Sequence, residues 1–100
     1  MNMIDLEKFL RELGLERPTL EQWIEREWVT PAPASSPRAP ADIELSEADV
    51  ARVIFIRDLR SDFGVNDEGV EIVLHLVDQL HGLRRAMRNL RVELRGRENP

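Results

Sequence analysis

The sequence predicts a mainly α-helical fold that ends in one long coiled-coil helix. Near the C-terminus, apolar residues recur at alternating spacings of three and four, which is the a/d pattern of a coiled coil. Upstream, shorter segments with helical apolar periodicity are separated by glycine and proline, which predicts short helices. One proline-rich stretch lies between them and is typical of neither a helix nor a central strand. The predicted fold class is therefore all-α, with a minimal β-hairpin beside the proline-rich stretch.

The composition limits the kind of protein this is. The 100 residues are 42% apolar, which predicts one small domain with a modest core. The net charge of −5 disfavours a protein whose main role is to bind nucleic-acid phosphates. The absence of cysteine excludes disulfides and thiolate zinc sites. No apolar run reaches membrane-spanning length, and the N-terminus lacks a signal pattern. We therefore expect a cytoplasmic protein with no membrane contact.

The N-terminal segment predicts two short helices joined by a polar turn. Apolar residues at helical spacing predict a first helix over 4–13, with Gly14 as its stop. Thr19 and Gln22 form a capping-box pattern, so we expect a second helix from Thr19 to about Trp28. Two short helices so closely spaced indicate a helix-turn-helix.

A proline-rich loop over 30–41 is expected to follow the second helix. It is flanked by Val29 and Thr30 on one side and by residues 43–45 on the other, and these flanks have the composition to pair as two short strands. In that arrangement the loop occupies the position of a wing, and residues 1–65 form a winged helix-turn-helix-like domain.

Two more helices are predicted after the loop. Ser46 and Asp49 are placed to cap the third helix, and Gly64 is its expected end. Asn66 is expected to cap the last helix, which extends over 66–96 and packs first on its own domain and then on a partner. The apolar face predicted for the third helix consists of Val50, Val53, Ile54, Ile56, Leu59 and Phe63.

The heptad pattern on the last helix predicts a homodimer. A helix of this length cannot bury its apolar seam inside so small a domain, so a second copy of the chain is the expected cover. The sequence leaves parallel and antiparallel pairing open. The predicted dimerisation residues are Leu76, Leu80, Leu83, Met87, Leu90 and Leu94, and Val73 extends the same pattern upstream.

The order of these elements is similar to that of the MerR-type winged-helix proteins. Residues 19–31 resemble the end of that family's reading helix and the start of its wing. Where the family's DNA readers carry arginine and tyrosine, this chain carries three glutamates: Glu21, Glu25 and Glu27.

A divergent branch, the CbpM-like chaperone modulators, resembles the chain more closely. Residues 58–80, DLRSDFGVNDEGVEIVLHLVDQL, are similar to that family's G-V-N-x-x-G-V-x-x-V-L-x-L-x-D block, and the likeness covers essentially the whole chain. The resemblance implies that the protein docks the J-domain of a DnaJ- or CbpA-type co-chaperone and inhibits its co-chaperone activity.

The charge pattern agrees with a basic partner. J-domains present a basic helix, which is a property of that family, and acidic side chains here are complementary to it. Residues 1–30 hold seven acidic and four basic side chains, and residues 42–78 hold ten and three. We expect carboxylates to supply charge and an exposed Trp28 to supply affinity. The predicted partner-binding residues are Glu21, Glu25, Trp28, Asp58, Asp62, Asp67 and Glu68.

The spacing of the remaining polar residues disfavours metal binding and catalysis. His75, Asp78 and His81 step by three and diverge around a helix, whereas helical metal-binding pairs sit four apart, so no metal site is predicted. No nucleophile–base pair, carboxylate pair or phosphate-cradling glycine loop is present, so we expect neither an enzyme nor a cofactor.

Two further functions stay open. The chain is also compatible with a MerR-type DNA-binding transcriptional regulator and with a dimerisation module for an unrelated partner. The arginines of the last turns fit contact with DNA or RNA phosphates, but we favour solubilisation and cross-strand pairing in the dimer. These arginines are Arg84, Arg85, Arg88, Arg91, Arg95 and Arg97.

Overall fold

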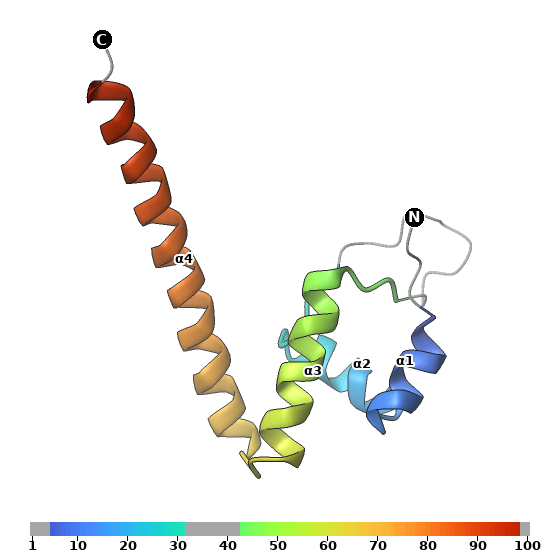
Figure 1. The fold of residues 1–100 in the computed structure, drawn as a ribbon. Coiled ribbons are helices and arrows are strands. Elements are labelled where there is room, and N and C mark those ends of the chain that lie inside the picture. The colour runs from blue at the N-terminus through green and yellow to red at the C-terminus, as the bar shows by residue number, and fades with distance from the viewer. Residues whose placement is uncertain (1–4, 32–42, 99–100) are drawn as a thin grey trace. The chain divides into compact units, whose positions relative to one another are not determined.

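The computed structural model describes residues 5–31 and 43–98, and that part of the chain contains four helices (Figure 1). The chain divides into two compact units, Met1–Asn66 with the first three helices and Asp67–Pro100 with the fourth. This confirms the all-helical class with a long C-terminal helix. The helices are α1 (Leu6–Leu13), α2 (Arg17–Glu25), α3 (Glu47–Ser61) and α4 (Asp67–Glu98).

The expected β-hairpin is not found in the residues that the structure describes. Neither residues 29–31 nor residues 43–46 form a strand. The Val29 N–H donates to the carbonyl oxygen of Trp23 at 3.4 Å, and Pro31 has no N–H, so this flank keeps few donors for a ladder. The strand prediction is therefore wrong for both flanks, and most of the predicted loop, residues 32–41, lies outside the described part.

Helix α1 ends where the sequence predicts, but it begins at Leu6 and not at residue 4 as expected. The Asp5 side chain caps it by accepting a hydrogen bond from the Lys8 N–H at 3.3 Å. Gly14 adopts a φ of 70°, a left-handed conformation that glycine reaches without strain. From that position the N–H of Leu15 returns to the carbonyl of Leu10 at 2.9 Å, which satisfies an end carbonyl. The expected stop at Gly14 is confirmed.

Helix α2 begins earlier than its capping-box pattern predicts. Glu16 is the N-cap and makes no side-chain cap bond, and Pro18 lies in the first turn. Proline is tolerated there because the first N–H groups of a helix have no partner within it. The N–H of Thr19 already donates to the Glu16 carbonyl at 3.0 Å, so Thr19 is inside the helix and its assignment as N-cap is wrong.

Helix α2 also ends before Trp28. Glu27 takes a φ of 63°, and the chain then folds back so that the Trp28 N–H donates to the Trp23 carbonyl at 2.9 Å. The Glu27 N–H donates to Ile24 at 3.0 Å, which completes a Schellman motif. The two tryptophan rings pack with centroids 6.2 Å apart, the apolar contact that accompanies such an end. Glu27 therefore lies beyond the helix that we expected to carry it.

Helix α3 confirms the predicted capping box. The Ser46 side chain accepts from the Asp49 N–H at 3.1 Å, and the Asp49 carboxylate accepts from the Ser46 N–H at 3.0 Å. The helix ends at Ser61, so Phe63 lies outside it and is 74% exposed. Phe63 was expected on the buried face, and that prediction is wrong because the helical period stops before it.

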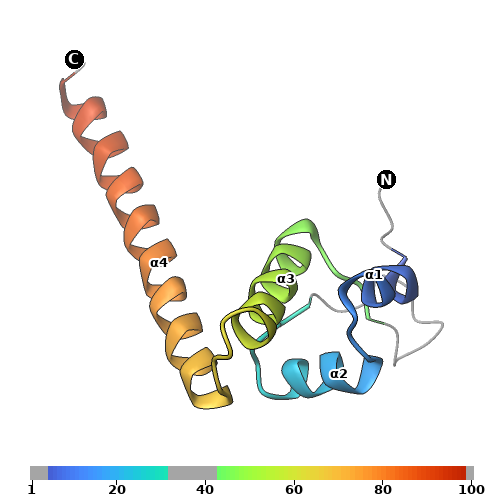
Figure 2. The same ribbon diagram turned by 60° about the horizontal axis from the view of Figure 1, so that its bottom comes forward.

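The core of the N-terminal unit draws on all three of its helices and on the turn after α2. Figure 2 shows α1, α2 and α3 in this unit from a second direction. Because large apolar side chains from each helix are removed from water, the unit carries its own stabilising core. Its buried apolar residues are Leu10, Leu20, Trp23, Trp28, Val29, Val53 and Ile56.

Helix α4 is long and mostly exposed. Its 32 residues span about 48 Å at ~1.5 Å per residue. Val70 and Leu74 are buried, whereas every residue from Asp78 to Arg97 is exposed. Despite this length, neither α4 nor another helix of the described chain is apolar enough to cross a membrane.

Candidate functional site

The exposed face of α2 is acidic. Leu20 and Trp23 point into the core, which turns the opposite side of the helix to solvent. That side presents two carboxylates and an amide, and the Glu21 carboxylate is paired with Arg17 of the first turn. Its residues are Pro18, Glu21, Gln22 and Glu25.

The cation at the start of α2 is held by carboxylates. Arg17 Nη1 lies 3.2 Å from Oε1 of Glu7 on α1, and its Nε lies 3.2 Å from Oε1 of Glu21. The Arg17 side chain is 37% exposed, so the pairs add little to stability. They do orient the guanidinium toward the protein's own acidic groups, which lowers its availability to an external anion.

Trp28 is a core residue and not an exposed anchor. It is 4% exposed, which contradicts the expectation that its ring supplies affinity to a partner. The Arg26 guanidinium lies 5.3 Å from its ring centroid, a cation–π arrangement, and Arg52 Nε donates to its carbonyl oxygen. Trp28 thus joins the end of α2 to α3.

The remaining predicted partner-binding residues lie near the end of α3 and the start of α4. Asp58 is half-buried, with Oδ1 3.2 Å from Arg57 Nε, and Asp62 is the exposed C-cap of α3. Asp67 and Glu68 form the acidic first turn of α4, where the helix dipole favours negative charge. The binding role of these four carboxylates stays a prediction.

The predicted dimerisation residues form an exposed apolar row on α4. Each is between 44% and 59% exposed, and they follow one another at alternating steps of three and four. Such a row is unfavourable in water unless something covers it. The row is Leu76, Leu80, Leu83, Met87, Leu90 and Leu94.

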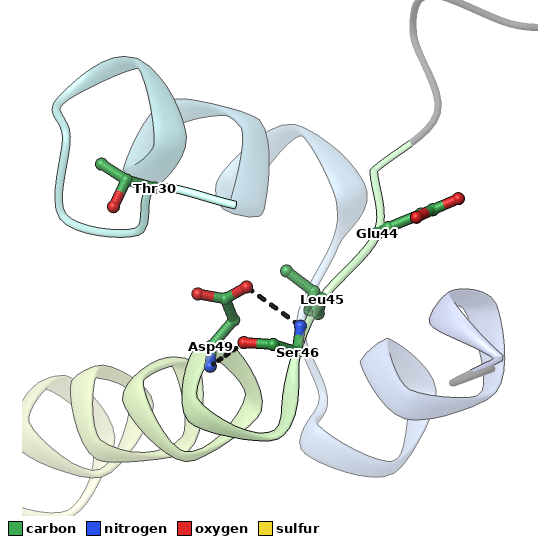
Figure 3. Close-up of a pocket in the computed structure, with 5 residues that line it drawn as sticks. All are labelled: Thr30, Glu44, Leu45, Ser46 and Asp49. Carbon is green, nitrogen blue, oxygen red and sulfur yellow. Dashed lines mark hydrogen bonds between the residues drawn. The ribbon is translucent and has the colours of Figure 1, made fainter. Parts of the chain in front are cut away.

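A depression of about 420 Å³ lies beside the N-terminus of α3 (Figure 3). Thr30, Glu44, Leu45, Ser46 and Asp49 line it. The polar side chains of Ser46 and Asp49 are used by the capping box, which Figure 3 shows as two dashed lines. The depression therefore has a structural explanation and offers no convergent set of groups for chemistry.

The described residues hold no cluster of three or more His, Cys, Asp or Glu side chains that could bind a metal ion. His75, Asp78 and His81 all lie exposed on α4. Nothing in this geometry assigns them a ligand role.

Two short helices joined by a tight glycine turn, a third capped helix and a long terminal helix are the architecture of a small helix-turn-helix protein. A family model described as MerR HTH family regulatory protein matches residues 4–92. The chain therefore belongs to the MerR HTH family of regulatory proteins. No curated protein and no solved structure gives a match.

Proposed function

We propose that this MerR-family protein is a protein-binding modulator that docks the J-domain of a DnaJ- or CbpA-type co-chaperone and inhibits it by occlusion. The acidic face of α2 is the observation that carries the proposal. In a DNA reader, the exposed side of this helix enters the major groove and needs donors and cations there. Here it offers Glu21, Gln22 and Glu25, which suit a basic protein surface.

The J-domain is the proposed partner because two independent features point to it. The stretch 58–80 resembles the CbpM-like chaperone modulators, and the acidic excess of the N-terminal unit complements the basic helix of a J-domain. Asp58 and Asp62 extend the acidic docking surface beyond α2 in this proposal.

The proposed modulator is a homodimer through α4. The exposed row of leucines has coiled-coil spacing, and a second copy of the same row covers it with matching side chains. In this arrangement each protomer presents one acidic docking surface, so the dimer carries up to two J-domains.

The first experiment is co-elution with the DnaJ-like co-chaperone of the same organism, with light scattering to give the mass. A peak with the mass of a dimer plus J-protein supports the proposal and fixes the stoichiometry. A peak that contains only the dimer of this chain removes the J-domain as its partner.

A matched pair of charge reversals tests the docking face. Glu25→Lys lies on the acidic face, whereas Glu12→Lys makes the same change in the last turn of α1, and both side chains are exposed. We expect Glu25→Lys to weaken J-domain binding about tenfold or more because like charges then meet in the complex. Equal effects of the two variants, or none, would remove α2 from the interface.

A DNA-binding regulator is the second candidate, and membership of the MerR HTH family favours it. The discriminating assay is a gel shift on the promoter fragments of the same organism with excess non-specific competitor, over a range of salt. A sequence-specific shift that weakens steeply with salt favours this candidate. Loss of that shift in an α2 variant such as Gln22→Ala would place the reading helix in the groove.

A further inference from the structure

The side of α3 that faces solvent carries an exposed aromatic ring. Ala51, Phe55, Asp58 and Asp62 are separated by four, three and four residues, so they lie along one side of this helix. Phe55 is 38% exposed, although the buried side chains of the same helix belong to the core of the N-terminal unit. Ala51, one turn before it, is also exposed and adds a small apolar side chain to the same side.

A second phenylalanine is held at the end of the same helix. Phe63 is 74% exposed, more than any other large apolar side chain that the structure describes. Its N–H donates to the Asp58 carbonyl at 3.2 Å, and the Val65 N–H donates to the Leu59 carbonyl at 2.8 Å. Gly64 allows this turn with a φ of 64°. Because these bonds fix the backbone that carries the ring, presenting Phe63 to a partner costs little ordering of the main chain.

Acidic side chains border these rings. Asp62 directly precedes Phe63 and is exposed, and so is Glu47 in the first turn of α3. Asp58 is half-buried and lies 3.2 Å from Arg57, so it contributes less outward charge than the other two. An apolar surface with acidic borders fits a partner that is apolar at the centre of its contact surface and basic at its edges.

We propose that the solvent face of α3 seats a basic amphipathic helix of the J-domain partner. This face is defined by Ala51, Phe55, Asp58, Asp62 and Phe63. The two rings are the apolar anchors that the buried Trp28 does not supply, and the carboxylates orient the basic helix. The inference rests on the proposed function for the identity of the partner. It adds that α3 carries part of the affinity, through apolar contacts as well as charge.

A second copy of the chain fits this face less well. In a two-fold contact the same acidic side chains would meet each other across the interface and repel. The unbroken apolar row lies on α4, whereas the solvent face of α3 alternates apolar and acidic residues. The negative charge of this face also disfavours nucleic-acid phosphates.

The test is isothermal titration calorimetry of the full chain with the DnaJ-like co-chaperone of the same organism, at several temperatures. Phe63→Ser should weaken binding about tenfold or more, because an exposed aromatic anchor is lost. It should also make the heat-capacity change of binding less negative, because less apolar surface is buried in the complex. A contact made by charge alone would leave the heat-capacity change unaltered.

The control is Val92→Ser, which removes an apolar side chain that is 67% exposed on α4 and off the heptad row. It should bind as the wild type does. Phe55→Ala is a second variant on the solvent face of α3 and should weaken binding in the same direction as Phe63→Ser. Urea denaturation of the three variants verifies that each stays folded.

Three outcomes would overturn the inference. If Phe63→Ser binds as tightly as the wild type, or if the control loses as much affinity, α3 does not anchor the partner and J-domain docking stands without it. If the wild-type chain does not bind the co-chaperone, the proposed function and this inference fall together. If Phe63→Ser lowers the mass of the dimer in light scattering, a second copy of the chain covers this face.

Discussion

The arginines of the N-terminal unit and those of α4 are in opposite situations. In the first unit Arg17 bridges two carboxylates, Arg26 lies over Trp28, and Arg52 donates to a backbone carbonyl. On α4, Arg88 and Arg91 stand exposed beside a row of exposed leucines. The first unit therefore uses these three arginines in its own contacts, whereas α4 leaves arginines and leucines exposed side by side.

The contrast between the N-terminal unit and α4 is tested most strongly by a substitution in the exposed apolar row of α4. The variant Leu83→Glu removes one large apolar side chain from each copy of the proposed seam. Burying a leucine is worth about 1.5–3 kcal/mol, so the dimer loses about 3–6 kcal/mol, or ~10²–10⁴-fold in affinity. Light scattering should show the mass fall from twice 11.6 kDa toward a single chain.

Val92→Glu is the control for this variant. Val92 is also apolar and is 67% exposed on α4, but it lies off the heptad row. Its variant should keep the dimer mass. A wild-type chain that is monomeric at every concentration, or equal dissociation by both variants, would contradict the proposed seam.

Trp28→Ala tests whether the N-terminal unit depends on its own core. It removes the contact with Trp23 and the ring beneath Arg26, and leaves a large cavity in the N-terminal unit. The free energy of unfolding should fall by about 3–5 kcal/mol, measured by urea denaturation. Trp28→Phe keeps an aromatic ring and should lose clearly less.

A small effect of Trp28→Ala, below about 1 kcal/mol, would show that this side chain is not part of the core. It would also restore Trp28 as a candidate contact for a partner. The stability of the Trp28→Ala variant should therefore be measured before its binding to the J-domain.

The sequence predicted what depends on local pattern. The stop at Gly14, the capping box of Ser46 and Asp49, and the long terminal helix all follow from residues within a turn of one another. Trp28 could not be placed in this way, because its burial depends on a Schellman turn with glutamate in place of glycine. The W-x-x-x-x-W spacing was a usable signal, since it sets the apolar contact of that motif.

Replacing a glycine by alanine should change stability in opposite directions in the N-terminal unit and in α4. At Gly14 the φ of 70° strains alanine, so Gly14→Ala should destabilise the N-terminal unit by about 1–2 kcal/mol. At Gly82 an added Cβ meets nothing within 4 Å, so Gly82→Ala should stabilise α4 by about 0.5–1 kcal/mol. Thermal unfolding of the two variants measures both.

A Gly82→Ala variant that is less stable than the wild type would bear on what contacts α4 at this position. Because the single chain offers no obstacle at that position, such a loss would indicate close approach of another molecule to this flank of α4. Concentration dependence of the loss would identify a second copy as that molecule.

The smallest predicted effect separates a real helix cap from an apparent one. Ser46→Ala removes a side chain that accepts from the Asp49 N–H, and should lower the stability of the N-terminal unit by about 1 kcal/mol. Thr19→Ala changes a residue with the same sequence signature that lies inside α2, so it should lower stability by less than about 0.5 kcal/mol. Urea denaturation of both variants compares them directly. If Thr19→Ala destabilises as much as Ser46→Ala, α2 begins at Thr19 after all, and the acidic face proposed to meet the J-domain starts one turn later.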